Sequence, residues 1–79
     1  MKLVIAKVDQ VYFDGEVLSV TVPGAEGELT VLGKHEAFVT TLKPGIITAR
    51  GGSVEAGEQI FEVQSGLLEV HSGGATIIL

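Results

Sequence analysis

Hydrophobic and polar residues alternate along much of this chain, with the period of two that is typical of strands buried on one face. Phe61 and Val63 alternate with polar neighbours, and Leu68 and Val70 do the same a few residues later. The pattern predicts nine strands, at about residues 3–8, 11–14, 16–22, 28–32, 37–42, 45–50, 58–64, 67–71 and 75–79.

The third predicted strand shows the alternation most fully. Leu18, Val20 and Val22 are expected to share one of its faces. The intervening Ser19 and Thr21 are then expected on the opposite face. Helical patterns are nearly absent by comparison. The best helical candidate covers residues 34–42, and its run of β-branched side chains weakens it.

Turn signals separate the predicted strands. Asp14-Gly15 is typical of a hairpin turn, and Lys43-Pro44-Gly45 fits a type II turn with glycine at its third position. Pro23-Gly24 followed by Gly27 indicates a loop over residues 23–28. Similar breaks recur roughly every 6 to 12 residues, a spacing that favours an all-β sandwich or barrel.

Composition narrows the class of protein. The chain has 79 residues, which suits one domain over residues 1–79, and its 46% hydrophobic content excludes intrinsic disorder. The absence of cysteine excludes disulfides and thiolate chemistry. No run of about 18 apolar residues exists to span a membrane. A net charge of −5 argues against nucleic-acid binding, which needs a basic surface.

Catalysis finds little support in the sequence. His35 and Glu36 are adjacent, so strand geometry would point them to opposite faces. His35 and His71 lack the close spacing of a metal-ligand pair. Glu26 and Glu28 could share a face, but no element nearby is expected to form a pocket around them. We therefore expect no enzyme activity, no cofactor and no metal.

The segment PGAEGE, residues 23–28, carries the strongest candidate for binding. A phosphate-binding loop would need a following helix and a lysine, and here a strand and two carboxylates follow. Two interpretations remain open: a solvated turn, or a docking loop that offers Glu26 and Glu28 to a basic partner surface.

Several motifs together resemble a known family. They are VTVPGAEGELTVL at residues 20–32, then His35, then LKPG at residues 42–45 and VQSGLLEV at residues 63–70. In this order they resemble the N-terminal domain of the epsilon subunit of F-type ATP synthases, over essentially the whole chain. The resemblance implies an all-β, flattened two-sheet β-sandwich of about nine to ten short strands.

The resemblance also implies a role and a set of contacts. The family's domain is a non-catalytic part of the central stalk, docks on the gamma subunit and the polar loops of the c-ring, and couples rotary ion transport to ATP synthesis. It lies at the cytoplasmic face of the bacterial inner membrane or the organellar equivalent. Glu26, Gly27 and Glu28 fall on the positions that face the basic c-ring loops. The positions that meet gamma are those of Lys7, His35 and Thr40.

Two departures from the family pattern are visible. Gly33 and Glu36-Ala37 stand where the family often has proline and Ala-Pro, so the loop around His35 loses rigidity. The family usually continues into a C-terminal helical hairpin that these residues lack, so we expect neither nucleotide binding nor inhibition by this chain. The alternative reading is a free-standing β-sandwich binding module or lipoyl-like carrier, which would need a modified lysine at a turn such as Lys34 or Lys43.

Overall fold

The computed structural model describes residues 1–34, 36–51 and 57–79, and in these ranges it has nine strands and no helix. The strands are β1 Lys2–Lys7, β2 Gln10–Glu16, β3 Ser19–Gly24, β4 Gly27–Leu32, β5 Phe38–Leu42, β6 Gly45–Arg50, β7 Glu58–Val63, β8 Gly66–His71 and β9 Gly74–Ile78. The predicted all-β fold is confirmed, and the weak helical signal at residues 34–42 was wrong because β5 occupies most of it.

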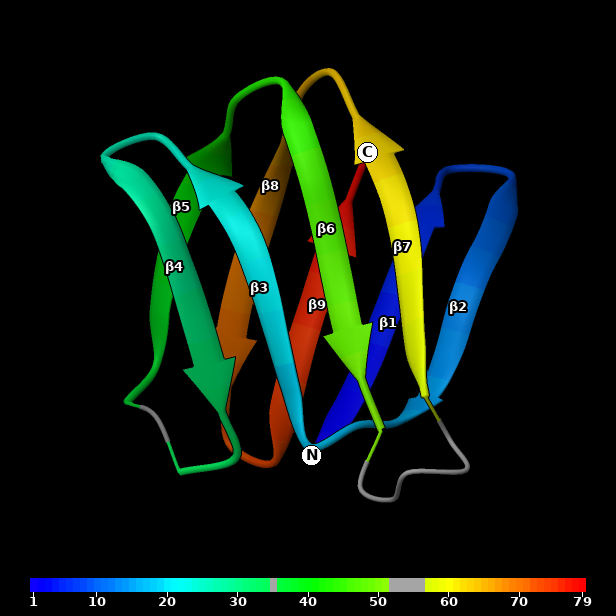
Figure 1. The fold of residues 1–79 in the computed structure, drawn as a ribbon, viewed down its shortest axis with the longest axis vertical. Helices are drawn as coiled ribbons and strands as arrows, with labels where there is room; N and C mark the ends of the chain where they lie inside the picture. Colours follow the sequence, from blue (N-terminus) through cyan, green and yellow to red (C-terminus); the bar gives the residue numbers. More distant parts are fainter. Residues whose placement is uncertain (35, 52–56) are drawn as a thin grey trace.

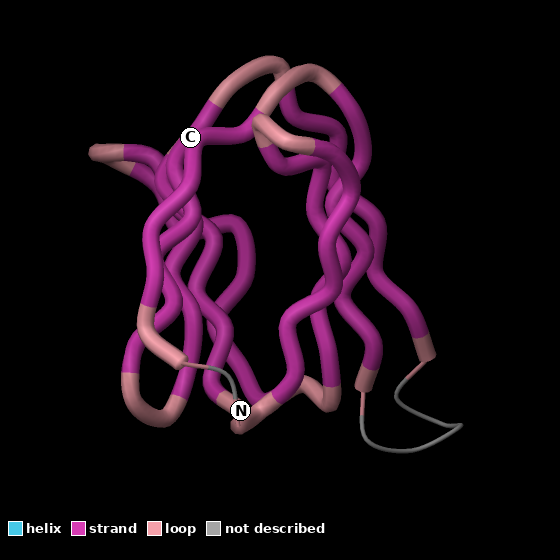
Figure 2. The backbone as a smooth tube through the Cα atoms, turned by 90° about the vertical axis from the view of Figure 1, so that its left-hand side faces the viewer, coloured by secondary structure: helices cyan, strands magenta, loops and turns pink. Residues whose placement is uncertain are grey.

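The strands form two layers (Figures 1 and 2). Hydrogen bonding joins them in the order β2-β1-β9-β8-β5-β3-β6-β7, with β4 on the other side of β3. We call the β4-β3-β6-β7 layer the front sheet and the β2-β1-β9-β8-β5 layer the back sheet, as they lie in Figure 1. One continuous sheet therefore curls over itself to make the flattened sandwich.

The inward side chains of both layers form one apolar core. Every strand supplies at least one residue to it or against it, and the two layers contribute almost equally. The fully enclosed large side chains are Leu3, Ile5, Val20, Val22, Val31, Ile47, Leu68 and Ile77. Because each alternates with an outward residue, the period of two in the sequence is the direct signature of this core.

The two sides of the sandwich close differently. At the β3–β5 corner, Gly24 pairs with Leu42 and the amide of Lys43 donates to the carbonyl of Pro23 at 3.0 Å, so the backbone joins the layers. On the opposite side, Phe13 of β2 and Phe61 of β7 meet edge to face, with ring centroids 6.0 Å apart. Aromatic packing thus closes the side that backbone hydrogen bonds leave open.

Three local predictions were wrong. Asp14-Gly15 lies inside β2, paired with β1, and the chain turns before it at residues 8–9. Leu18 precedes β3 and is 61% exposed, so it does not share the buried face of Val20. Gly45 begins β6 without a positive φ, which excludes the type II turn that needed one there.

Candidate docking surface

A tight hairpin between β3 and β4 carries the predicted c-ring contacts. The predicted loop over residues 23–28 is shorter than expected: only Ala25 and Glu26 lie between the strands, because Gly24 pairs with Gly27 and Pro23 with Glu28. The amide of Ala25 also donates to the carbonyl of Thr41 on β5, at 3.0 Å. The hairpin is therefore held from both layers of the sandwich.

Two glycines permit this geometry. Gly27 has a φ of +131°, which residues with a side chain rarely adopt. A Cβ on Gly24 would lie 2.8 Å from the Leu29 Cδ2 atom and 2.9 Å from the Gly27 carbonyl oxygen. The spacing of glycines in PGAEGE thus fixes where the two carboxylates of the hairpin stand.

Glu26 and Glu28 are both exposed, at the end of the sandwich where the chain links 8–9, 25–26, 43–44 and 64–65 gather (Figure 1). Glu26 lies in the turn itself, and Glu28 follows on β4. Neither carboxylate forms an ion pair with any residue in the described ranges. Three other carboxylates are neutralised within the chain, namely Asp14 by Lys2, Glu16 by the amino terminus and Glu58 by Arg50. Asp9, Glu36, Glu62 and Glu69 resemble the hairpin carboxylates in forming no ion pair with the described residues.

The predicted gamma contacts do not form one cluster. Lys7 ends β1 and lines an open groove of about 410 Å³ together with Glu62, Gln64 and Leu79. Thr40 lies on β5, is half-buried, and donates its hydroxyl to the Thr41 carbonyl at 3.2 Å. Both belong to the back sheet, where β9 and β8 separate their strands. His35 lies outside the described residues.

The arrangement offers little for catalysis or metal binding. The described residues contain no group of three or more histidine or carboxylate side chains that could hold a metal ion. His71 lies on the exposed face of β8, with Nε2 3.2 Å from the Thr76 hydroxyl and Nδ1 3.2 Å from the Ser72 carbonyl. The described part of the chain contains no helix with the length and apolar character needed to cross a membrane.

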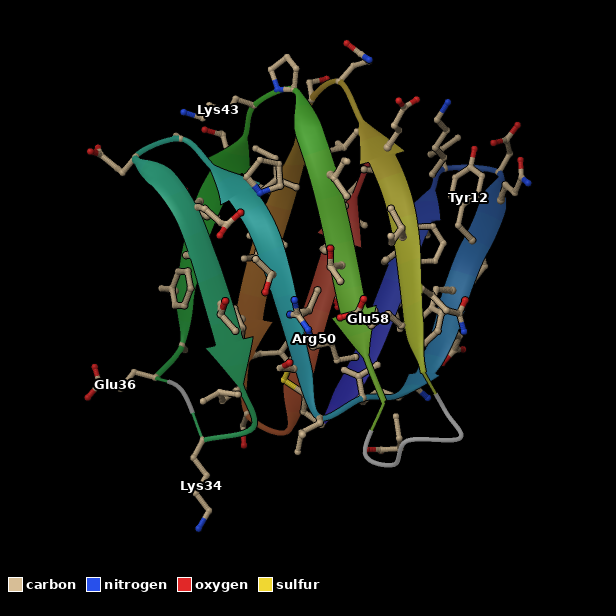
Figure 3. All side chains as sticks on the ribbon, in the orientation of Figure 1. Tyr12, Lys34, Glu36, Lys43, Arg50 and Glu58 are labelled. Carbon is tan, nitrogen blue, oxygen red and sulfur yellow. The ribbon has the colours of Figure 1, made fainter. Side chains whose placement is uncertain are left out.

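Sequence reasoning missed a polar network on the outer face of the front sheet. Arg50 of β6 donates from Nε to Glu58 of β7 and from a terminal nitrogen to the Thr21 hydroxyl of β3, both at 2.9 Å. That hydroxyl also lies 2.9 Å from the Thr30 hydroxyl of β4. Figure 3 shows Arg50 and Glu58 side by side over this sheet. The cross-strand register that unites them was not available from spacing alone.

A second contact that sequence reasoning missed joins β1 to the edge strand β2 of the back sheet. Lys2 Nζ lies 2.9 Å from Asp14 Oδ1 across β1 and β2. The hydrogen bond and charge of Asp14 raise the pKa of Lys2 above its ordinary value of 10.5. The pair had no signature in the sequence, because Asp14 was assigned to a turn.

The fold and its exposed features define a small two-layer β-sandwich domain whose distinctive groups lie on its surface. The whole chain, residues 1–79, matches the family described as "ATP synthase, Delta/Epsilon chain, beta-sandwich domain". The chain belongs to this family, as the resemblance predicted.

Relatives and solved structures agree. The chain is 43% identical over 70 residues to an ATP synthase epsilon chain of Bradyrhizobium sp. (strain BTAi1), covering 89% of this chain and 50% of that one. It is 42% identical over 66 residues to the epsilon chain of Caulobacter vibrioides, covering 84% and 73%. The chain thus spans about half the length of several curated relatives that it matches.

Two solved assemblies contain the same fold. A chain of the Euglena gracilis mitochondrial ATP synthase, in a structure of OSCP, F1 and c-ring, superposes with a TM-score of 0.85 at 27% identity, over 96% of this chain and 48% of that one. A chain of the Tetrahymena thermophila central stalk and c-ring superposes with a TM-score of 0.78 at 24% identity, over 98% and 60%. At that identity the second likeness shows the fold alone.

Proposed function

We propose that this chain acts in the central stalk of an F-type ATP synthase, at the cytoplasmic face of the bacterial inner membrane or its organellar equivalent. There it docks on the gamma subunit and on the polar loops of the c-ring, and helps to couple rotary ion transport to ATP synthesis. Its role is non-catalytic and requires no bound nucleotide. Family membership and the exposed hairpin at Glu26-Gly27-Glu28 support this proposal.

The main support for the proposed c-ring contact is that the two hairpin carboxylates are exposed and form no ion pair among the described residues. Glu26 and Glu28 differ from the other carboxylates without an ion pair in the described ranges, Asp9, Glu36, Glu62 and Glu69, in standing two residues apart on one tight hairpin. A carboxylate that is exposed and has no ion pair within the chain is available to pair with a positive charge on a partner. The hairpin therefore suits a basic partner surface such as the c-ring loops.

The fold suits a part that transmits torque. Backbone pairing at the β3–β5 corner and the donation from Ala25 to Thr41 hold the hairpin against both layers. A force applied to Glu28 passes directly into the β3–β4 ladder, which has six registered pairs. If the contact lay on a long flexible loop, the loop would deform before the force moved the domain.

The charge reversal Glu28→Lys tests the proposal. The full chain is mixed with the purified c-ring and, separately, with the gamma subunit of the same organism, and both affinities are measured by biolayer interferometry at fixed salt. We expect c-ring binding to weaken by about tenfold or more, since like charges then meet across the contact. Gamma binding should stay within about twofold.

Glu69→Lys is the matched control, because Glu69 is also an exposed strand glutamate without an ion pair among the described residues, on the other sheet. It changes the net charge identically, so it should leave c-ring binding close to wild type. If both variants weakened c-ring binding equally, the effect would be one of net charge and the hairpin contact would be refuted. Wild-type chain that bound neither partner would refute the stalk role itself.

A further inference from the structure

We propose that the sandwich opens along one side as a unit, with β2 and β7 separating from each other while the β3–β5 corner stays closed. We call the line of contact between β2 and β7 the seam. The inference goes beyond the proposed function, because it concerns a motion of the domain itself and is tested without a partner. It follows from the different ways in which the two sides of the sandwich are held together.

The strand order leaves the seam without a backbone connection. β2 and β7 lie at the two ends of the hydrogen-bonded order, so neither strand pairs with the other. Within the described residues, β2 pairs only with β1, and β7 pairs only with β6. Figure 1 shows the two strands on the same side of the molecule, one in each layer. Their separation would therefore break no strand pairing in the described ranges.

The β3–β5 corner, on the opposite side, is held by backbone atoms of both layers. The amide of Lys43 donates to the Pro23 carbonyl at 3.0 Å. The amide of Ala25 donates to the Thr41 carbonyl at the same distance. Packing here is close as well, because a Cβ on Gly45 would lie 2.8 Å from the Cβ of Pro23. Hydrogen bonds and close packing resist separation, so this corner is the hinge about which the layers would open.

An aromatic contact joins the two strands of the seam. Phe13 of β2 and Phe61 of β7 meet edge to face with their ring centroids 6.0 Å apart, and both side chains are half-buried. Gly15 leaves its face of β2 to the Phe13 ring, whose Cζ atom would lie 3.5 Å from a Cβ on that glycine. The Asp14-Gly15 pair, which has the composition of a turn, thus serves the seam. A ring contact of this kind is able to break and re-form while the rest of the domain stays folded.

The two strands of the seam are also the least buried of the sandwich. β2 has no buried residue, and Val63 is the one buried residue of β7. In β3, by contrast, five of the six residues are buried. Elements with few buried apolar contacts open at the lowest free-energy cost in native proteins. Low burial therefore makes β2 and β7 the strands that we expect to open first.

A small pocket lies in the seam. It has a volume of about 60 Å³ and is lined from both layers, with Phe13, Glu16 and Val17 on one side and Ala49, Gly57 and Gln59 on the other. Glu16 and Gln59 bring polar side chains to it, so water that enters the pocket finds hydrogen-bond partners. The seam therefore gives way to water more readily than a close-packed boundary would.

Hydrogen exchange of the full chain, measured by NMR, tests the proposal. We expect two groups of amides to exchange fastest, those of β2 that are bonded to β1 and those of β7 that are bonded to β6. After correction for intrinsic rates, both groups should exchange at least tenfold faster than the corner amides of Ala25 and Lys43. β4 is the reference for ordinary fraying, because it is also an edge strand and pairs with β3.

Phe61→Ala is the decisive variant, and Ile60→Ala is its matched control. Ile60 is the adjacent residue of β7, is 63% exposed and points away from the core. Phe61→Ala should speed exchange in β2 about tenfold, although β2 does not pair with β7, and should leave β4 within threefold of wild type. Ile60→Ala should leave both β2 and β4 within threefold of wild type.

Further variants keep the test decisive. Phe13→Ala should speed exchange in β7, which is the reciprocal effect across the seam. If Phe61→Ala does not fold, Phe61→Leu gives the same comparison with a smaller change, because it keeps an apolar side chain without the ring. β2 amides that exchanged as slowly as those of Ala25 and Lys43 would overturn the opening. Equal acceleration of β2 and β4 by Phe61→Ala, or none in β2, would refute the coupling across the seam.

Discussion

The two outer faces of the sandwich come from the same alternation in sequence but carry different side chains, a hydrogen-bonded polar network on one and a row of uncharged residues on the other. On the front sheet, a chain of hydrogen bonds from Thr30 through Thr21 and Arg50 to Glu58 crosses all four strands. On the back sheet, the outward residues Val11, Ala6, Ile78, Leu67 and Thr41 pair across five strands, and none of them is charged. A period of two therefore reveals which residues point outward, but not whether they bind one another across the sheet.

The largest effect should come from comparing two adjacent leucines of β8. Leu68 is fully buried, while Leu67 points outward and is 39% exposed. Leu68→Ala should lower the free energy of unfolding by about 3 kcal/mol, since it leaves a cavity in the core. Leu67→Ala should cost less than about 1 kcal/mol, because the site is already open to water. Urea unfolding followed by circular dichroism measures both. Equal losses of stability in the two variants would contradict this division of β8 into a buried face and an outward face.

Much of this architecture was predictable, because the strands are short and most of them alternate between buried and exposed residues. Val20, Val22, Leu68 and Val70 all face the core as their spacing required. Turns were harder to place. Asp14-Gly15 has the composition of a hairpin turn, yet it pairs inside β2, because the ladder with β1 and the contact of Phe13 with Phe61 outweigh local preference.

Pairing partners distant in sequence could not be predicted from alternation. The parallel pairing of β1 with β9 joins the two ends of the chain, and no local signal announces it. That pairing places Ala6 beside Ile78, 72 positions further along the chain. For the same reason the hairpin at Glu26 and Glu28 was predictable as a candidate site, since it is local, whereas the neighbours of Ala6 across the back sheet were not.

A smaller effect is expected from the polar network of the front sheet. Thr21→Val keeps the shape of the side chain and removes the hydroxyl that bridges Arg50 and Thr30. The loss should be about 1 kcal/mol in the free energy of unfolding, as for other hydrogen bonds near a surface. Thr48→Val is the control, because that hydroxyl has no hydrogen bond to any described residue and its loss should cost almost nothing. A similar cost for both would mean that the network adds no stability.

The smallest effect concerns the ion pair that neutralises the margin of the back sheet. Asp14 raises the pKa of Lys2 in the folded chain, so the pair stabilises folding fully below the unfolded pKa of about 10.5 and is lost as pH rises through the higher folded value. Lys2→Met should therefore lower the urea midpoint slightly at pH 7, and the gap from wild type should close above that pKa. Both groups are about half exposed, so salt should shrink the gap as well. Lys43→Met, which removes an exposed lysine without an ion pair among the described residues, should show no such closing. A gap that persisted at high pH would mean that the lysine stem, and not its charge, holds β1 against β2.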